Sequence, residues 1–415
     1  MSAPAKSAPP PDGPGQAGRG ATAGERPLRV STLEIFFDLV FAFTLTQLTA
    51  LIADQLSWRA AAQVLLIFGL LWWMYGAYAW LTNSRPPVHT AERLLLLVGM
   101  AGFLVIGLAI PRGFSGYGIV LGLGYLVVVV VHGVLFYRVN ANILRVVPFS
   151  LCSAVLVTVA GLLPRPAGTA GAAAYALWIA ALAIQLGSPL VVHPAGRFEL
   201  RPSHFIERHN ALLIVAIGES VAAIGIGAAG PVSRSAHVSW QLLASSVLGL
   251  AVAAALWWLV FGVGDEERAE RTLSTAPGTR RAQLALSALF YGNIPLLLGL
   301  VAVAAGILRA VVQAAGHAGP PPGSAARIGQ AAVLAVGAAL FLAGDAATRW
   351  QLRLGPARPR VVAGVAALAT TAVGVFAGLN VQLIVVAVVL VAPLAAEPRQ
   401  AGEDPAGRPE GPDHQ

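Results

Sequence analysis

Charged residues are scarce in this sequence. Only 11% of its 415 residues are Asp, Glu, Lys or Arg, and 57% are hydrophobic, whereas about a quarter of an ordinary soluble protein is charged. This shortage excludes a soluble globular class and predicts an integral membrane protein. The net charge of +8 does not indicate nucleic acid as a partner, because the basic residues stand singly or in pairs between apolar runs, without a basic patch interleaved with aromatics.

Lysine and cysteine are nearly absent as well. Lys6, near the N-terminus, is the single lysine, so a phosphate-binding GxxxxGK loop and a catalytic Schiff base within the apolar part are both excluded. The single cysteine, Cys152, excludes an intramolecular disulfide, a cysteine-rich zinc site and an iron–sulfur cluster. No GxSxG elbow occurs either. We expect no bound cofactor, and the chemistry that remains is that of carboxylates, histidines and arginines.

Long apolar runs dominate what is present. Twelve of them approach or exceed the roughly 17 to 25 residues that a membrane-spanning helix needs, so the predicted fold class is all-α, a polytopic membrane protein of about twelve helices. The runs lie near residues 32–53, 60–81, 93–110, 117–137, 143–163, 171–191, 206–228, 238–262, 283–308, 328–347, 361–378 and 380–396. Residues 1–28 and 398–415 are rich in Ala, Pro, Gly and charge, and we expect them to be disordered tails that flank a transmembrane domain at 29–397.

The arginines between the runs predict the orientation of the chain. With a cytoplasmic N-terminus, 21 of the 27 basic residues fall on the cytoplasmic side of the twelve-run scheme. This imbalance is what the positive-inside rule expects, and it places both termini in the cytoplasm. The six on the opposite side are Arg59, Arg112, Arg165, Arg234, Arg309 and Arg327.

A weak internal repeat suggests two six-helix halves, about 29–200 and 201–397, inserted the same way round. The segment LWW occurs at 71–73 and again at 256–258, and the same shift of 185 residues carries Glu34 onto Glu219. Parallel repeats often frame a binding site at their interface. The alternative is that both tryptophan pairs belong to the aromatic belt at the membrane surface.

Acidic residues inside the runs are the first candidates for a site. Of nineteen acids, nearly all lie in tails and loops, and the first run carries Glu34 and Asp38. On a helical wheel, Glu34, Asp38 and Thr49 lie within about 60° of one another, so this helix has a polar stripe that must face other helices. The alternative is that the two acids cap the helix start and pair with Arg26 or Arg29 at the surface.

The segment HFIERHNALLIVAIGES at 204–220 is the second candidate. It begins with a charged group at His204, Glu207, Arg208 and His209, and it carries Glu219 and Ser220 about 20 Å into its helix. We expect Asp38 to be the partner of Arg208, and Gly218 and Ser220 to let another helix approach closely. Glu219 is the deepest acid in the chain; it is either part of a solute or ion pathway or a neutral side chain that joins helices by a hydrogen bond.

The histidines of this segment do not predict a metal site. His204 and Glu207 share a helix face but His209 does not, and their spacing matches neither HExxH nor ExxH. Asp345 and Arg349 are spaced as a structural i,i+4 pair. We therefore expect no metal ion.

The quoted motifs resemble a known family. LEIFFDLVFAF and HFIERHNALLIVAIGES, together with the LWW segments, resemble the signature segments of the bacterial low temperature requirement A family of multi-pass membrane proteins, over essentially residues 30–396. The chain differs from the usual pattern at Asn210, where glycine is common, and at Gly262, where an acid often follows the tryptophans. The resemblance implies the bacterial inner membrane and no mechanism. It marks Glu34, Phe36, Phe37, Asp38, His204, Glu207, Arg208, Gly218, Glu219 and Ser220.

Three functional classes fit these observations. The first, which we favour, is a secondary transporter or a proton- or ion-conducting protein that uses the buried acids. The second is a membrane-integral enzyme or lipid-handling protein with a polar site at the cytoplasmic leaflet, and the third is a non-catalytic structural or regulatory protein. The expected partners are the lipid bilayer and a small solute or ion, and no feature of the sequence indicates an oligomeric state.

Overall fold

The computed structural model describes residues 30–84, 86–137, 145–164, 170–191, 201–229, 239–262, 264–316 and 323–395, and within these ranges every element is helical. Ten helical stretches are long and apolar enough to cross a membrane, and α5 and α14 are shorter apolar helices. The tails predicted at 1–28 and 398–415 lie outside the described residues. The elements are α1 (Thr32–Gln55), α2 (Trp58–Ser84), α3 (Thr90–Ala109), η1 (Ile110–Arg112), α4 (Gly118–Tyr137), α5 (Val147–Leu162), α6 (Ala172–Val191), α7 (Pro202–Ala229), α8 (Trp240–Phe261), α9 (Asp265–Thr275), α10 (Gly278–Leu284), η4 (Ala285–Tyr291), α11 (Asn293–Ala314), α12 (Ser324–Leu352), α13 (Arg358–Ala377) and α14 (Leu379–Ala395).

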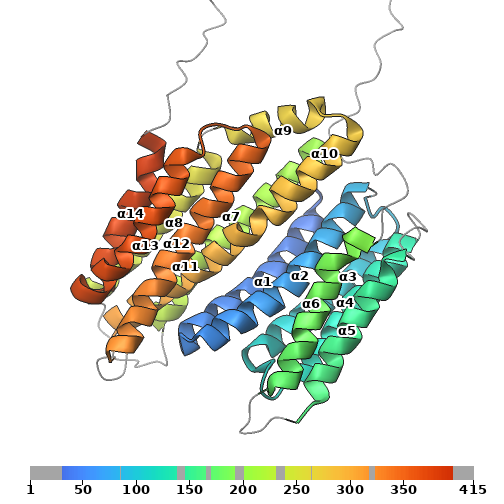
Figure 1. Ribbon diagram of the computed structural model, residues 1–415, viewed down its shortest axis with the longest axis horizontal. Coiled ribbons are helices and arrows are strands. Elements are labelled where there is room, and N and C mark those ends of the chain that lie inside the picture. Colours follow the sequence, from blue (N-terminus) through green and yellow to red (C-terminus); the bar gives the residue numbers. More distant parts are fainter. Residues whose placement is uncertain are drawn as a thin grey trace, which may run out of the picture.

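The helices form two groups that lie side by side, α1–α6 and α7–α14 (Figure 1). In the first group α3 packs against α1 and α4, α5 packs against α4 and α6, and α2 packs against α6. In the second, α11 packs against α7 and α12, α13 packs against α12 and α14, and α8 packs against α14. The two groups meet where α1 contacts α7 and α11. The order of neighbours is therefore the same in both groups.

A buried glutamine occupies the last helix of each group. Gln185 of α6 donates to Tyr125 of α4 at 2.8 Å and accepts from Ser150 of α5 at 3.2 Å. Gln382 of α14 donates to the Ala331 carbonyl of α12 at 2.8 Å and to Thr370 of α13 at 3.3 Å. Each amide joins its helix to two neighbours, as interhelical hydrogen bonds commonly do in membranes.

The region predicted as a loop after residue 262 contains a further helix that the sequence analysis missed. α9 is short and charged, with Asp265, Glu266 and Glu267 in its first turn, where acids complement the helix dipole. Ala269 and Leu273, four residues apart, bury one face of it. Arg281 donates to the carbonyls of Leu273, Ser274 and Ala276 and so completes its C-terminal end. α9 lies across one end of the helix groups (Figure 1), called here the α9 end.

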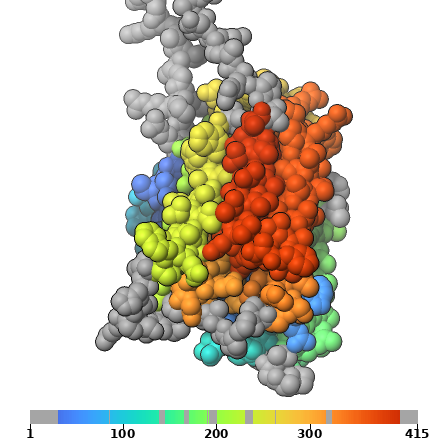
Figure 2. Space-filling model, turned by 90° about the vertical axis from the view of Figure 1, so that its left-hand side faces the viewer, coloured from blue at the N-terminus to red at the C-terminus, as the bar shows by residue number. Residues whose placement is uncertain are grey.

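The outward surface has the character of a lipid-facing surface. Figure 2 shows α14 at the surface between α8 and α13. Ile384, Val388 and Val391 of α14 are exposed. Large aromatics are exposed near both ends of the helices: Trp58 and Trp240 begin α2 and α8 at the end opposite α9, and Trp350 lies near the α9 end of α12. Two such levels of exposed tryptophan are typical of the two membrane–water interfaces.

The two LWW segments have different surroundings. Trp257 and Trp258 are 44% and 57% exposed, which fits the aromatic-belt alternative, whereas Trp72 is 1% exposed and donates its indole N–H to the Phe290 carbonyl at 3.0 Å. The shared letters therefore do not mark shared contacts.

Candidate functional site

Arg208 of α7 lies buried between the two acids of α1. Its guanidinium is 3.0 Å from a carboxylate oxygen of Glu34 and 3.5 Å from Oδ1 of Asp38. All three residues are at most 3% exposed. The polar stripe expected on the first helix does face another helix, and it does so because a buried arginine and buried carboxylates stabilise one another only as partners. Glu34 also caps its own helix, since Ser31 and Glu34 form a capping box at the start of α1.

Tyr75 and Thr82 of α2 complete this group. We call it the Arg208 cluster, and its members are Glu34, Asp38, Tyr75, Thr82, His204 and Arg208. Tyr75 donates its hydroxyl to Asp38 Oδ1 at 2.9 Å, and Thr82 accepts a hydrogen bond from Arg208. The guanidinium carbon lies 5.5 Å from the Phe37 ring centre and 5.7 Å from that of Tyr75, within the range of cation–π contacts.

His204 has a defined tautomer in this geometry. Asn83 Oδ1 accepts from the Arg201 backbone N–H at 3.1 Å, so its Nδ2 is the atom that donates to the Arg201 carbonyl and to His204 Nδ1. With Nδ1 as an acceptor, a neutral His204 carries its proton on Nε2, which faces Glu34 at 3.4 Å. The cluster then holds one guanidinium and two carboxyl groups, so full ionisation leaves one negative charge in excess.

The two carboxyl groups of α1 differ in how fully they are hydrogen bonded. Both oxygens of Glu34 are bonded: one by Arg208, the other by Ser31 and His204. Oδ2 of Asp38 is buried and has no partner among the described residues. A buried carboxylate oxygen without a donor is costly unless the group is protonated or binds a cation. Glu34 is thus the fixed counter-ion, and Asp38 is the acid that can accept a proton or cation.

Glu219 forms a second, separate polar contact between α1 and α7. Thr46 donates to its Oε2 at 2.6 Å, while its Oε1 and the Ser220 hydroxyl are buried without a partner among the described residues. Glu219 is 6% exposed. Eight residues separate Asp38 from Thr46 on α1, so the Arg208 cluster and this contact lie about 12 Å apart along the helix.

The remaining candidates lie outside these two contacts. Glu207 is half-buried and accepts from the Val30 backbone N–H at 3.4 Å, so it does not share the Arg208 cluster. The expectation for Gly218 is wrong: it is exposed, and a Cβ built there meets nothing within 4 Å, because it lies on the face of α7 opposite the packed one. Among the described residues, no group of three His, Cys, Asp or Glu could hold a metal ion.

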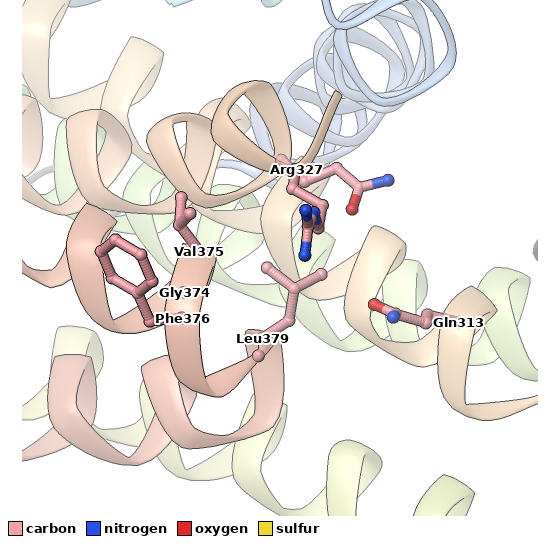
Figure 3. Close-up of a pocket in the computed structure, with 8 residues that line it drawn as sticks. Gln313, Arg327, Gly374, Val375, Phe376 and Leu379 are labelled. Carbon is pink, nitrogen blue, oxygen red and sulfur yellow. The ribbon is translucent and has the colours of Figure 1, made fainter. Parts of the chain in front are cut away.

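A cavity of about 540 Å³ lies far from these acids, at the end opposite α9. Arg327 of α12 and Gln313 of α11 are directed toward it, beside Leu379 of α14 (Figure 3). None of the residues that line it is acidic. It is therefore distinct from both polar contacts.

Several residues of the structure could not be found from sequence patterns. Tyr75 and Thr82 belong to the Arg208 cluster, but a lone tyrosine and a lone threonine in an apolar run carry no distinguishing signal. A second buried set of ion pairs lies near α9: Arg349 donates to Asp265, and Arg360 donates to Asp345 at 2.6 Å. The sequence spacing suggested Asp345 with Arg349 on the same helix, and it could not indicate Asp265 and Arg360, which come from other helices.

Comparison with known proteins agrees with this arrangement of motifs. The model of the bacterial low temperature requirement A protein family matches residues 29–395, which include the whole described bundle. The chain belongs to this family. An uncharacterised protein of Rhizobium meliloti (strain 1021) is 25% identical over 301 residues, covering 67% of this chain and 68% of its own. No solved structure is similar to the chain. The family assignment agrees with a bacterial membrane protein and leaves the activity to be argued from the two acid sites.

Proposed function

We propose that this family member is a secondary transporter or a proton- or ion-conducting protein in which Asp38 and Glu219 take up and release the moving species. One observation carries the proposal. Both acids keep one buried oxygen without a partner among the described residues, and both lie on the contact between α1 and α7. Intramembrane acids of this kind commonly mark ion pathways and proton relays.

The two-half arrangement supports the position of this pathway. The same order of neighbours in α1–α6 and α7–α14, and the glutamines at Gln185 and Gln382, favour six-helix halves in parallel repeat. α1 and α7 are then the first helix of each half, and the pathway lies at the interface of the repeats, where transporters of several folds bind their substrates.

The arrangement favours transport over work on lipids. A lipid-handling site needs polar groups that are open to the membrane or to its surface, but Asp38, His204 and Arg208 are each at most 1% exposed. A purely structural role explains Glu34 and Arg208, which are paired. It does not explain why Asp38 and Glu219 each keep a buried oxygen without a hydrogen-bond partner among the described residues.

Reconstitution into liposomes tests the proposal. We expect purified protein to carry protons or a small ion down an imposed gradient faster than protein-free liposomes do. Glu267→Gln should carry at the wild-type rate, because Glu267 lies on the surface of α9 with its side chain 85% exposed. If the wild type moves no ion or solute above the protein-free rate while it stays folded, the proposed function is wrong.

We also propose that the α9 end faces the cytoplasm, as the arginine distribution predicts, with twelve spans and both termini on that side. Reporter fusions at Ser115, Gly168 and Ser233 should then read external, and fusions at Pro87, Gly196 and Gly278 should read cytoplasmic. The reason is the 21 to 6 split of basic residues. Two reversed readings among the six would contradict this topology.

A further inference from the structure

An apolar layer separates the two acid sites. Phe41 and Leu45 of α1, Trp72 of α2, and Leu212 and Ala216 of α7 belong to one hydrophobic cluster, and none of them is more than 1% exposed. On α1 they lie between Asp38 and Thr46, and on α7 they lie between Arg208 and Glu219. We call these five apolar side chains the Trp72 layer; among the buried side chains of α1 and α7 between the two sites, the polar ones are Thr44 and His209. Hydrophobic constrictions of this kind close pores by excluding water.

Trp72 is the member of the layer that is held in place by a hydrogen bond. Its indole N–H donates to the Phe290 carbonyl at 3.0 Å, and its ring stacks on that of Phe290 at 5.4 Å between centres. Phe290 belongs to η4, a π-helix, and such segments are rare and often lie at functional sites. In η4 the carbonyl of Ala288 also accepts a side-chain bond, from Thr348 at 3.2 Å.

Gly76 allows this contact to form. A Cβ at Gly76 would lie 2.1 Å from a ring atom of Phe290, so any larger residue there must displace the ring. The position of Trp72 therefore depends on Phe290 of the π-helix, and the Phe290 ring fits beside α2 because Gly76 has no side chain.

A proton acceptor lies beside the Trp72 layer. His209 is 1% exposed, and the centre of its ring is 6.3 Å from that of Trp72. Its Nδ1 is 2.8 Å from the Phe205 carbonyl, which only a protonated Nδ1 can bond, so a neutral His209 presents Nε2 as an acceptor. Nε2 has no partner among the described residues.

The side-chain oxygens at the Glu219 contact do not by themselves complete the ligand shell of calcium or magnesium. Its own two oxygens, the Thr46 hydroxyl and the Ser220 hydroxyl make four at most, and the Thr46 hydroxyl already donates to the carboxyl group. Calcium takes six to eight oxygen ligands, and magnesium takes six in near-octahedral geometry. A proton needs one oxygen, and Oε1 is free to take it.

We propose that the species exchanged between Asp38 and Glu219 is a proton, and that Trp72, held on η4 by Phe290, is the gate between them. The inference rests on the proposed function and names its substrate and its gate. When Trp72 leaves Phe290, water enters the layer. The O–H bond of one carboxylic acid then breaks, the proton passes along water and His209, and an O–H bond forms on the other carboxylate.

Proton flux into liposomes with a pH-sensitive dye tests the gate. Trp72→Phe keeps an aromatic ring but loses the N–H donor, so we expect a rise of roughly fivefold to tenfold, the size set by one net hydrogen bond. Gly76→Ala adds a Cβ that displaces the Phe290 ring, so it should also raise the flux. If Trp72→Phe does not fold, Gly76→Ala takes its place in the test. Trp258→Phe is the control, because Trp258 is exposed on α8.

Adding Glu219→Gln to the faster variant should return the flux to the protein-free rate, and tracer Na⁺ and K⁺ should stay at that rate in all variants. An unchanged flux in folded Trp72→Phe and Gly76→Ala would overturn the gate, as would a raised flux that survives Glu219→Gln. Flux of Na⁺ or K⁺ that depends on Glu219 would overturn the proton while leaving the proposed function standing. Absence of every flux from the wild type would refute the proposed function itself.

Discussion

Glu219→Gln is expected to reduce flux through the reconstituted protein to the protein-free rate while the protein remains folded. Glutamine has the size of glutamic acid and can still accept the hydrogen bond from Thr46, which the structure gives as 2.6 Å. It cannot take up or release a proton. The substitution therefore removes titration and leaves the contact between α1 and α7 in place.

The size of the effect separates a pathway from a structural role. If Glu219 only joins the two helices, glutamine should replace it with nearly full activity, since both side chains accept a hydrogen bond at the same place. Glu219→Asp should retain part of the flux, because the carboxyl group still titrates but its shorter side chain is displaced from Thr46. Melting temperature and gel filtration in detergent check that each variant is folded. Full flux in Glu219→Gln would remove Glu219 from the mechanism.

Asp38→Asn extends the same test to the other acid. If the two acids act in series on one pathway, Asp38→Asn should abolish the flux as Glu219→Gln does, and the double variant should be no worse than either single one. Effects of residues that act as a unit are not additive. If the two substitutions reduce the flux independently and additively, Asp38 acts only as an ion-pair partner of Arg208.

The sequence allowed the buried polar contact between α1 and α7 to be predicted, because a charge in an apolar run has few physical explanations. The stripe of Glu34 and Asp38 predicted that α1 faces other helices, and Arg208 required an acidic partner. The pattern could not tell which acid was nearer: the geometry gives 3.0 Å to Glu34 and 3.5 Å to Asp38. That choice depends on how α1 and α7 cross, which hydropathy does not encode.

The uncharged residues around the Arg208 cluster could not be predicted from the sequence, for a related reason. Trp72 and Tyr75 are ordinary members of an apolar helix until Phe290 and Asp38 are placed beside them, 218 and 37 residues away. Gly218 shows the opposite error. Its neighbour Glu219 is packed, and periodicity along the helix put Gly218 on another face, which is exposed. Adjacency in sequence is a poor guide to the packed face of a helix.

Arg208→Met is expected to destabilise the protein more than any other single substitution in the Arg208 cluster. Methionine fills much of the same volume but leaves Glu34 and Asp38 buried without their cation. Removing one partner of a buried ion pair typically costs about 3 to 5 kcal/mol, because the remaining charge is uncompensated. Unfolding in detergent, followed by circular dichroism, should show the loss, and expression should fall with it.

The triple variant Arg208→Met, Glu34→Gln, Asp38→Asn identifies the cause. It removes all three charges together, so we expect it to regain a large part of the stability that Arg208→Met loses, since replacing a whole buried ion pair is often close to neutral. The control is Arg271→Met on α9, where the arginine side chain is 73% exposed and the change should be within about 0.5 kcal/mol. If Arg208→Met is as mild as Arg271→Met, or if the triple variant is no more stable than the single one, the guanidinium does not balance the two acids. The role of Glu34 as a fixed counter-ion would then have to be abandoned. A triple variant that regains stability but has no flux would instead show that the ion pairs stabilise the protein and that its activity needs at least one of the three charged groups.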